Sequence, residues 1–138
     1  MRSIQRFVVV IGVSMLALGC AAMRAAEERR RAEIETARSA DYDVDRNKVT
    51  EAVLSSLLQL DYTIDRQIPT SGYIETNFVE RPLLGSMHRV RIAAQVSEQR
   101  PHSVAIQAQV LSSEKSAPAT FENEIYLLVH QKLTQPRR

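Results

Sequence analysis

One cysteine and three histidines are the side chains of this sequence that most readily bind metals or act as nucleophiles. Cys20 is the only cysteine among 138 residues, so the sequence offers neither an internal disulfide nor a cysteine-based metal site. His88, His102 and His130 fall on different predicted elements, and their spacing is not that of metal ligands. A zinc site would need two of them to converge with a carboxylate. We therefore predict no metal site and no cofactor.

Ser86 in the sequence Gly85-Ser86-Met87-His88 is a further candidate nucleophile. The sequence lacks the second glycine of a nucleophile elbow, and a strand rather than a helix is predicted to follow it. The whole chain has four glycines and no glycine-rich phosphate-binding loop. These observations predict that the protein is not an enzyme.

The charge balance depends on whether the first nineteen residues stay attached. The chain has 18 basic and 16 acidic residues, with a formal net charge of +2. Residues 1–19 contain two arginines and no acid, so their removal leaves a chain with no net charge. Composition therefore gives no general electrostatic argument for binding nucleic acid.

An export signal is predicted at the N-terminus. Arg2 and Arg6 form a short positive region, and the apolar run from Phe7 to Leu18 follows it. That run has the size of a signal-peptide core and is shorter than the ~20 residues that span a bilayer. The run closes as Leu16-Ala17-Leu18-Gly19-Cys20, which resembles the lipobox of bacterial lipoproteins.

The lipobox resemblance implies a diacylglycerol thioether on Cys20, cleavage after Gly19 and acylation of the new amino terminus. Ala21 and Ala22 follow, with no aspartate next to Cys20, which in Gram-negative lipoproteins is similar to an outer-membrane address. We expect an anchor in the inner leaflet of the outer membrane, facing the periplasm. A plain secretory signal with a chance cysteine, or an uncleaved anchor, are the alternatives.

The sequence divides into four predicted segments. Residues 1–19 are the signal peptide, and residues 20–42 are the lipidated cysteine with a charged helical tether rich in Ala, Glu and Arg. Residues 43–134 are a small α+β periplasmic domain, and residues 135–138 are a basic tail.

The domain is predicted as an α+β two-layer sandwich in the order helix-strand-strand-strand-strand-helix. A helix capped by Asp43 or Asp45 should run to about Leu60, and a second helix from Thr120 to about Leu133 should bury Phe121, Ile125, Leu128 and Val129. Between them, Tyr73 to Val79 should form a strand with Ile74, Thr76 and Phe78 on one face, and residues 81–86 should break it. Apolar and polar residues alternate most clearly over 89–96 and 103–110. We expect a four-stranded antiparallel meander with both helices on one face.

The pattern of a helix followed by Leu60-Asp61-Tyr62-Thr63-Ile64 and Gly72-Tyr73-Ile74-Glu75-Thr76 is similar to helix-grip domains of envelope-assembly lipoproteins. The C subunit of the β-barrel assembly machinery is an example of that family. The resemblance implies a membrane-anchored, non-enzymatic accessory or interaction subunit of an outer-membrane assembly, export or secretion complex.

Two surfaces are candidates for binding an envelope protein partner. Arg89 and Arg91 should point outward from the sheet beside Tyr73, and arginine can bind carboxylate or phosphate through two hydrogen bonds. Leu54 and Leu58 extend the apolar arc of the first domain helix. The alternatives are a solvated face of cross-strand ion pairs and a second helix packed beside the leucines.

The alternative function is a ligand-binding lipoprotein that grips a lipid or a cell-envelope glycan between sheet and helices. Ala94, Ala105 and Ala108 would leave room for such a ligand, or would let the helices approach the sheet closely.

Overall fold

A computed structural model describes residues 2–111 and 117–135, with side chains from residue 19 onward, and divides into two units, Met1–Glu33 and Ile34–Arg138. The first unit lies within helix α1 (Arg2–Ser39), whose residues beyond Cys20 are mostly the helix formers Ala, Glu and Arg. In the described part of the chain, no helix combines the length and the apolar character that crossing a membrane requires. Only Gln135 of the predicted basic tail, residues 135–138, lies among the described residues.

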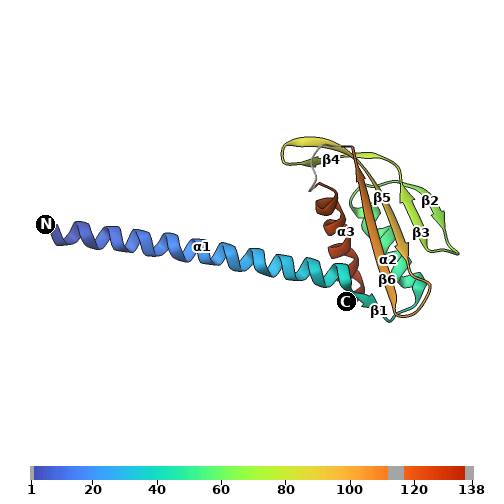
Figure 1. The fold of residues 1–138 in the computed structure, drawn as a ribbon, viewed down its shortest axis with the longest axis horizontal. Helices are drawn as coiled ribbons and strands as arrows, with labels where there is room; N and C mark the ends of the chain where they lie inside the picture. Colours follow the sequence, from blue (N-terminus) through green and yellow to red (C-terminus); the bar gives the residue numbers. More distant parts are fainter. Residues whose placement is uncertain (1, 112–116, 136–138) are drawn as a thin grey trace. The chain divides into compact units, whose positions relative to one another are not determined.

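The second unit is built on one antiparallel sheet (Figure 1). The strands run β1-β6-β5-β3-β2 across it, and β4 pairs with β5 beside β3. The predicted α+β class with an antiparallel sheet is confirmed, but the sheet has six strands where four were predicted. Their bounds are β1 (Asp41–Tyr42), β2 (Ile64–Ile68), β3 (Tyr73–Thr76), β4 (Val79–Leu83), β5 (Ser86–Val96) and β6 (His102–Val110).

Strand β4 corrects the prediction that residues 81–86 interrupt the sheet. The chain leaves β3 at Asn77-Phe78 and resumes as β4, which pairs with the first half of β5 while β3 pairs with the second half. The Thr76 hydroxyl accepts a 2.9 Å hydrogen bond from the Ile92 amide at this break, in place of a strand partner. Pro82 fits here because β5 is the only strand that pairs with β4 among the described residues, so the missing N–H faces no second strand.

The core lies between one face of the sheet and two helices, α2 (Arg46–Gln59) and α3 (Ala117–Thr134). Alternate residues of β5 and β6 are buried on this face, and their neighbours are on the outer face. Ala94 and Ala108 are buried within this core, whereas Ala105 is exposed, so the small inward residues allow close helix packing. The buried helix residues are Val49, Ala52, Val53, Ser56 and Leu57 on α2, and Ala117, Phe121, Ile125, Tyr126 and Val129 on α3.

The helix predictions are confirmed in part. Of the two candidate caps, Asp45 caps α2, because its carboxylate accepts a hydrogen bond from the Asn47 amide. Helix α3 begins at Ala117 rather than at Thr120, and Tyr126 rather than Leu128 completes its buried stripe. The tyrosine is buried because its hydroxyl finds partners at the edge of the sheet.

The folded unit begins earlier than the predicted boundary at residue 43. Ala37, in the last turn of α1, is only 3% exposed, and Tyr42 on β1 is also buried. Strand β1 pairs with the start of β6 through Asp41 and Tyr42. The end of the predicted tether is therefore part of the core.

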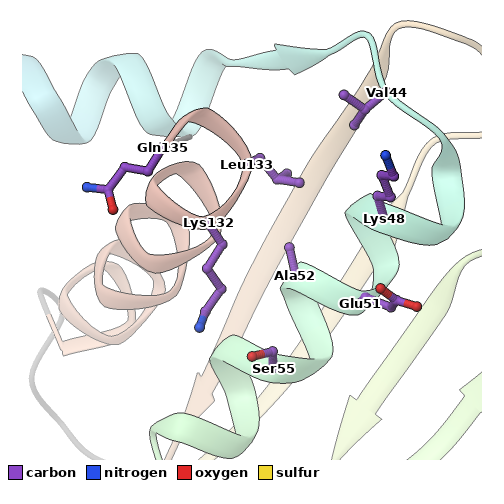
Figure 2. Close-up of a pocket in the computed structure, with 8 residues that line it drawn as sticks. All are labelled: Val44, Lys48, Glu51, Ala52, Ser55, Lys132, Leu133 and Gln135. Carbon is purple, nitrogen blue, oxygen red and sulfur yellow. The ribbon is translucent and has the colours of Figure 1, made fainter. Parts of the chain in front are cut away.

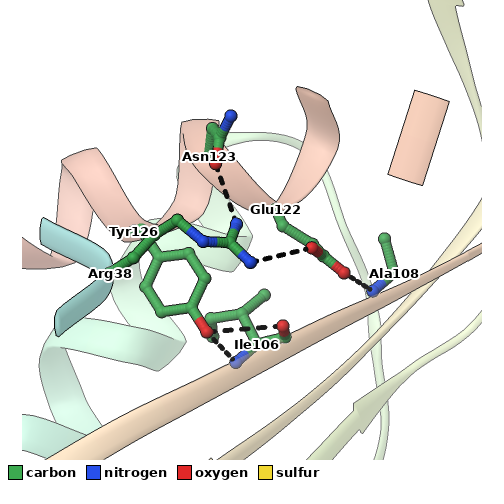
Figure 3. A network of polar contacts seen from close by, with 6 residues as sticks. All are labelled: Arg38, Ile106, Ala108, Glu122, Asn123 and Tyr126. Carbon is green, nitrogen blue, oxygen red and sulfur yellow. Dashed lines mark hydrogen bonds and ion pairs between the residues drawn. The ribbon is translucent and has the colours of Figure 1, made fainter. Parts of the chain in front are cut away.

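Helix α3 closes the part of the β6 edge that β1 does not cover (Figure 3). The Tyr126 hydroxyl accepts a hydrogen bond from the Ile106 amide at 2.7 Å, and the Glu122 carboxylate accepts one from the Ala108 amide at 2.9 Å. Arg38 holds both acceptors, since it pairs with Glu122 at 3.4 Å and lies 4.8 Å from the centre of the Tyr126 ring. These bonds satisfy edge amides that would otherwise be free to pair with another chain.

The Tyr126→Phe substitution should destabilise the protein because it leaves the buried Ile106 amide without its acceptor. The expected loss is ~1–3 kcal/mol in the free energy of unfolding, measured by urea denaturation. Tyr62→Phe is the matched control, since the Tyr62 hydroxyl is buried with no hydrogen-bond partner among the described residues. That control should leave stability unchanged or slightly raised, and equal losses in the two variants would contradict the role given to Tyr126.

Candidate functional site

The outer face of the sheet carries a cluster of arginine and aromatic side chains, which we call the arginine–phenylalanine cluster: Phe78, Arg89 and Arg91. The guanidinium carbons of Arg91 and Arg89 lie 4.7 Å and 5.7 Å from the centre of the Phe78 ring. Both distances are within the range of cation–π attraction. The ring thus holds two cations close together on an exposed surface.

Neighbouring polar groups neutralise one of these arginines. Arg91 donates a 2.6 Å hydrogen bond to the side-chain oxygen of Gln109 and lies 3.9 Å from the Glu75 carboxylate. Arg89 is exposed, and Glu80 lies opposite it on β4, but among the described residues no carboxylate forms an ion pair with it. Arg89 is therefore the cation of this cluster that is most available to a negatively charged group from outside.

Tyr73 borders the cluster through Glu75. Its hydroxyl donates a short hydrogen bond to the Glu75 carboxylate. This hydrogen bond raises the pKa of Tyr73 above its usual value, with smaller contributions from burial and from the Glu75 charge. Arg66 and Arg91 act in the opposite direction. The phenol is thus held neutral, and it fixes the carboxylate beside Arg91.

The structure brings three of the five predicted partner-binding residues onto one surface. Tyr73, Arg89 and Arg91 all lie on the outer face, on β3 and β5. Leu54 and Leu58 lie on α2 instead, where Leu54 is partly buried against the core and Leu58 is 58% exposed. The alternative of a second helix beside the leucines is present, because α3 packs beside α2. Of the two leucines, only Leu58 remains exposed to solvent.

Phe78 is the residue of the cluster that the sequence pattern places wrongly. Strict alternation from Ile74 and Thr76 puts it on the inner face. The break at Asn77-Phe78 shifts the register, so that Val79 packs against the core and Phe78 lies under the arginines. The available signal was Asn77, a residue that is rare inside strands.

The described residues contain no group of three or more His, Cys, Asp or Glu that could hold a metal. His130 Nδ1 lies 3.0 Å from the Tyr42 hydroxyl, and His102 Nδ1 lies 2.8 Å from the Ser97 carbonyl oxygen. Ser86 opens strand β5 rather than a helix, so the geometry of a nucleophile elbow is not formed.

A groove of about 550 Å³ lies between α2 and α3 (Figure 2). Ala52 and Leu133 contribute apolar surface, and Lys48 and Lys132 bring two ammonium groups. The Lys132 amine already donates a 2.9 Å hydrogen bond to the side-chain oxygen of Gln59, and Glu51 adds a carboxylate to the lining. The groove is therefore of mixed charge.

Tyrosine ionisation should report the environments of Tyr73 and of the buried Tyr42 and Tyr62. Burial raises the pKa of Tyr42 and of Tyr62 from 10 to about 12. Because these folded-state values exceed the unfolded ones, the neutral phenols stabilise the fold below pH 10, and this contribution is lost as the pH rises through about 12.

In an alkaline titration followed by phenolate absorbance, the native curve should therefore be shifted to higher pH than the curve of the protein in denaturant. Tyr73→Phe should remove one of the phenols that ionise at raised pH. The ionisation of Tyr42 and Tyr62 near pH 12 should remain. Superimposable native and denatured curves would contradict these environments.

Comparison of the sequence with models of known protein families and with curated proteins finds no significant match. The lipobox and helix-grip resemblances therefore stand as predictions from the residues. The case for function rests on the chemistry of Cys20 and on the geometry of the outer sheet face.

Proposed function

We propose that this chain is a lipid-anchored envelope protein that acts as a non-enzymatic interaction subunit of an outer-membrane assembly, export or secretion complex. The observation that carries the proposal is the outer sheet face, which the helices leave uncovered while it presents the arginine–phenylalanine cluster. A one-sided sheet with an organised cationic and aromatic surface is suited to docking.

The anchor in this proposal is Cys20. Its side chain is exposed on α1, so its sulfur is accessible to the enzyme that acylates a lipobox. Several acyl chains hold a protein far more firmly than one, at ~0.8 kcal/mol per buried methylene.

Lipidation can be tested by labelling cells with radioactive palmitate. The wild-type protein should take up label and sediment with membranes, whereas Cys20→Ala should lose the label, because no other cysteine is present to carry the thioether. Label that persists in the Cys20→Ala variant, or a labelled protein that keeps residues 1–19, would contradict the lipobox interpretation.

The cluster is suited to an acidic partner surface. Arg89 offers a planar fork of donors that can bind a carboxylate through two hydrogen bonds, and the Phe78 ring restricts where that fork can lie. A guanidinium already held in place loses less conformational entropy when it binds. The supporting feature is therefore preorganisation rather than positive charge alone.

The docking surface can be tested by affinity isolation of the full-length lipidated protein in mild detergent, followed by protein mass spectrometry. Wild-type protein should recover an envelope protein in stoichiometric amount. Arg89→Glu combined with Arg91→Glu should reduce that recovery about tenfold or more, because two attractive contacts become repulsive.

Ala105→Glu is the matched control, since it adds a negative charge on the same sheet face, four residues along β6 from Gln109, the residue that pairs with Arg91. It should leave recovery unchanged, as should Leu58→Ser on α2. Thermal unfolding of each variant checks that the sheet is intact. A complex that survives both arginine substitutions, or that Leu58→Ser alone removes, would count against the outer face.

The groove between α2 and α3 supports a second candidate, a lipoprotein that binds an amphiphilic ligand. Its volume of about 550 Å³ is within the range of small-molecule sites, and Lys48 could bind an anionic headgroup. The carboxylate of Glu51 and the existing hydrogen bond of Lys132 to Gln59 weaken the groove as an anion site. We therefore place this candidate second.

A further inference from the structure

The end of the β4–β5 hairpin exposes large apolar side chains that the core does not use. Leu84 is 84% exposed, Met87 is 60% exposed and Leu111 is 56% exposed. Leu111, just after β6, lies level with Arg89, because its amide donates a 3.0 Å hydrogen bond to the Arg89 carbonyl. We call Leu84 and Met87 the hairpin tip.

The backbone at Leu84 shows that this residue does not serve the turn. Leu84 and Gly85 form a two-residue connection with φ values of +52° and +79°. Such turns favour Asn-Gly, because asparagine and glycine tolerate positive φ and leucine adopts it at a cost. A leucine that is unfavourable for the turn and almost fully exposed gains nothing inside the folded chain. Its use is therefore expected in a contact outside the chain.

The hairpin is held firmly at its base. Arg81 on β4 donates hydrogen bonds to the Leu60 carbonyl and, at 3.0 Å, to the Glu124 carboxylate of α3. Its guanidinium carbon also lies 5.0 Å from the centre of the buried Tyr62 ring. The tip is thus presented on a braced hairpin whose position is set by the core.

Along the outer face of this hairpin, the side chains change from apolar near the turn to charged at Arg89. Met87 pairs with the exposed Pro82 near the tip, and Arg89 follows two residues further along β5, on the same face. At ~3.4 Å per residue, the arginine lies about 10 Å along the strand from the turn. Apolar segments that insert at a membrane surface reach about 5–10 Å into the boundary between headgroups and acyl chains. Arg89 would then lie at the depth of the headgroup phosphates.

We propose that the hairpin tip inserts into an anionic lipid surface, with Leu84 and Met87 among the acyl chains and Arg89 on a headgroup phosphate. Arg89 fits this role because Glu80, its cross-strand neighbour on β4, forms no ion pair with it, nor does any other carboxylate of the described residues. A guanidinium also binds phosphate through two hydrogen bonds. Three side chains bury far less than the ~1,200 Å² of a stable protein interface, which favours a bilayer over a protein groove. The inference goes beyond the proposed protein partner, and it needs no partner to be present.

The chain contains no tryptophan, so one introduced indole reports its own surroundings. The full-length protein carrying Leu84→Trp would be reconstituted into phosphatidylethanolamine vesicles, with and without phosphatidylglycerol, that contain lipids brominated on their acyl chains. Met87→Trp is a second reporter that leaves the turn unchanged. Gln107→Trp is the matched control on the same sheet face away from the tip.

Both tip reporters should show blue-shifted emission and about twofold or stronger quenching than the control when phosphatidylglycerol is present. Arg89→Glu added to either reporter should abolish that difference. Equal quenching at the tip and at residue 107 overturns the proposal, and so does tip quenching that ignores both phosphatidylglycerol and Arg89→Glu. Tip burial seen only in native membranes, and not in these vesicles, also overturns it and identifies a protein as the occupant.

Leu84→Asn separates the external role from a folding role. Asparagine suits positive φ, so the thermal midpoint should rise while the Met87→Trp reporter in this background loses quenching. A lowered midpoint would show that Leu84 serves the turn after all and would overturn the proposal. The vesicles contain no protein partner, whereas the affinity isolation is done in detergent without a bilayer, so either proposal can fail without the other.

Discussion

The hydrogen bonds from α3 to the edge of β6 are the interaction on which the rest of this domain depends. Tyr126 and Glu122 satisfy the Ile106 and Ala108 amides, and the same helix buries Phe121 and Ile125 in the core. Helix α3 therefore covers a face and an edge of the sheet at once. Arg38 extends this arrangement to the last turn of α1, which explains why the folded unit begins before β1 (Figure 3).

This arrangement determines where function can be located. Both helices are used on the inner face, and the β6 edge is occupied by β1 and by side chains of α3. The outer sheet face and the hairpin end are the large surfaces that receive no such cover in the described parts of the chain. The arginine–phenylalanine cluster and the hairpin tip are both found there, and along β5 Arg89 is the arginine of the cluster nearer to the tip.

Regular alternation made the centre of the fold predictable from the sequence. Val90 and Ile92 on β5, and Val104 and Ile106 on β6, are buried as the period of two requires. The features that escaped prediction are departures from regularity. The pairing of Asp41 and Tyr42 with β6 is too short to leave a pattern, and a buried alanine such as Ala37 does not differ from the other alanines of the tether.

The sequence predicted only those residues of the candidate site that lie on regular strands. Arg89 and Arg91 are placed correctly because β5 is regular, whereas Phe78 is misplaced because the break at residues 77–78 changes which face it occupies. Leu54 and Leu58 looked equivalent on a helical wheel, but the position of α2 against the core separates a partly buried residue from an exposed one. Tertiary packing, which no local pattern contains, makes that distinction.

The register of the β4–β5 hairpin places its three arginines in different environments. Arg81 points inward, where Glu124 and the Leu60 carbonyl compensate its burial. Arg91 points outward and is balanced by Glu75 and Gln109, so it contributes mainly to the order of the surface. Arg89 points outward opposite Glu80 but forms no ion pair among the described residues, and it lies about 10 Å along β5 from the turn that holds Leu84 at positive φ. An unpaired cation and an unfavourable turn residue each have a cost for folding, and their occurrence at one end of a well-braced hairpin is the pattern expected where a surface is kept for an external contact.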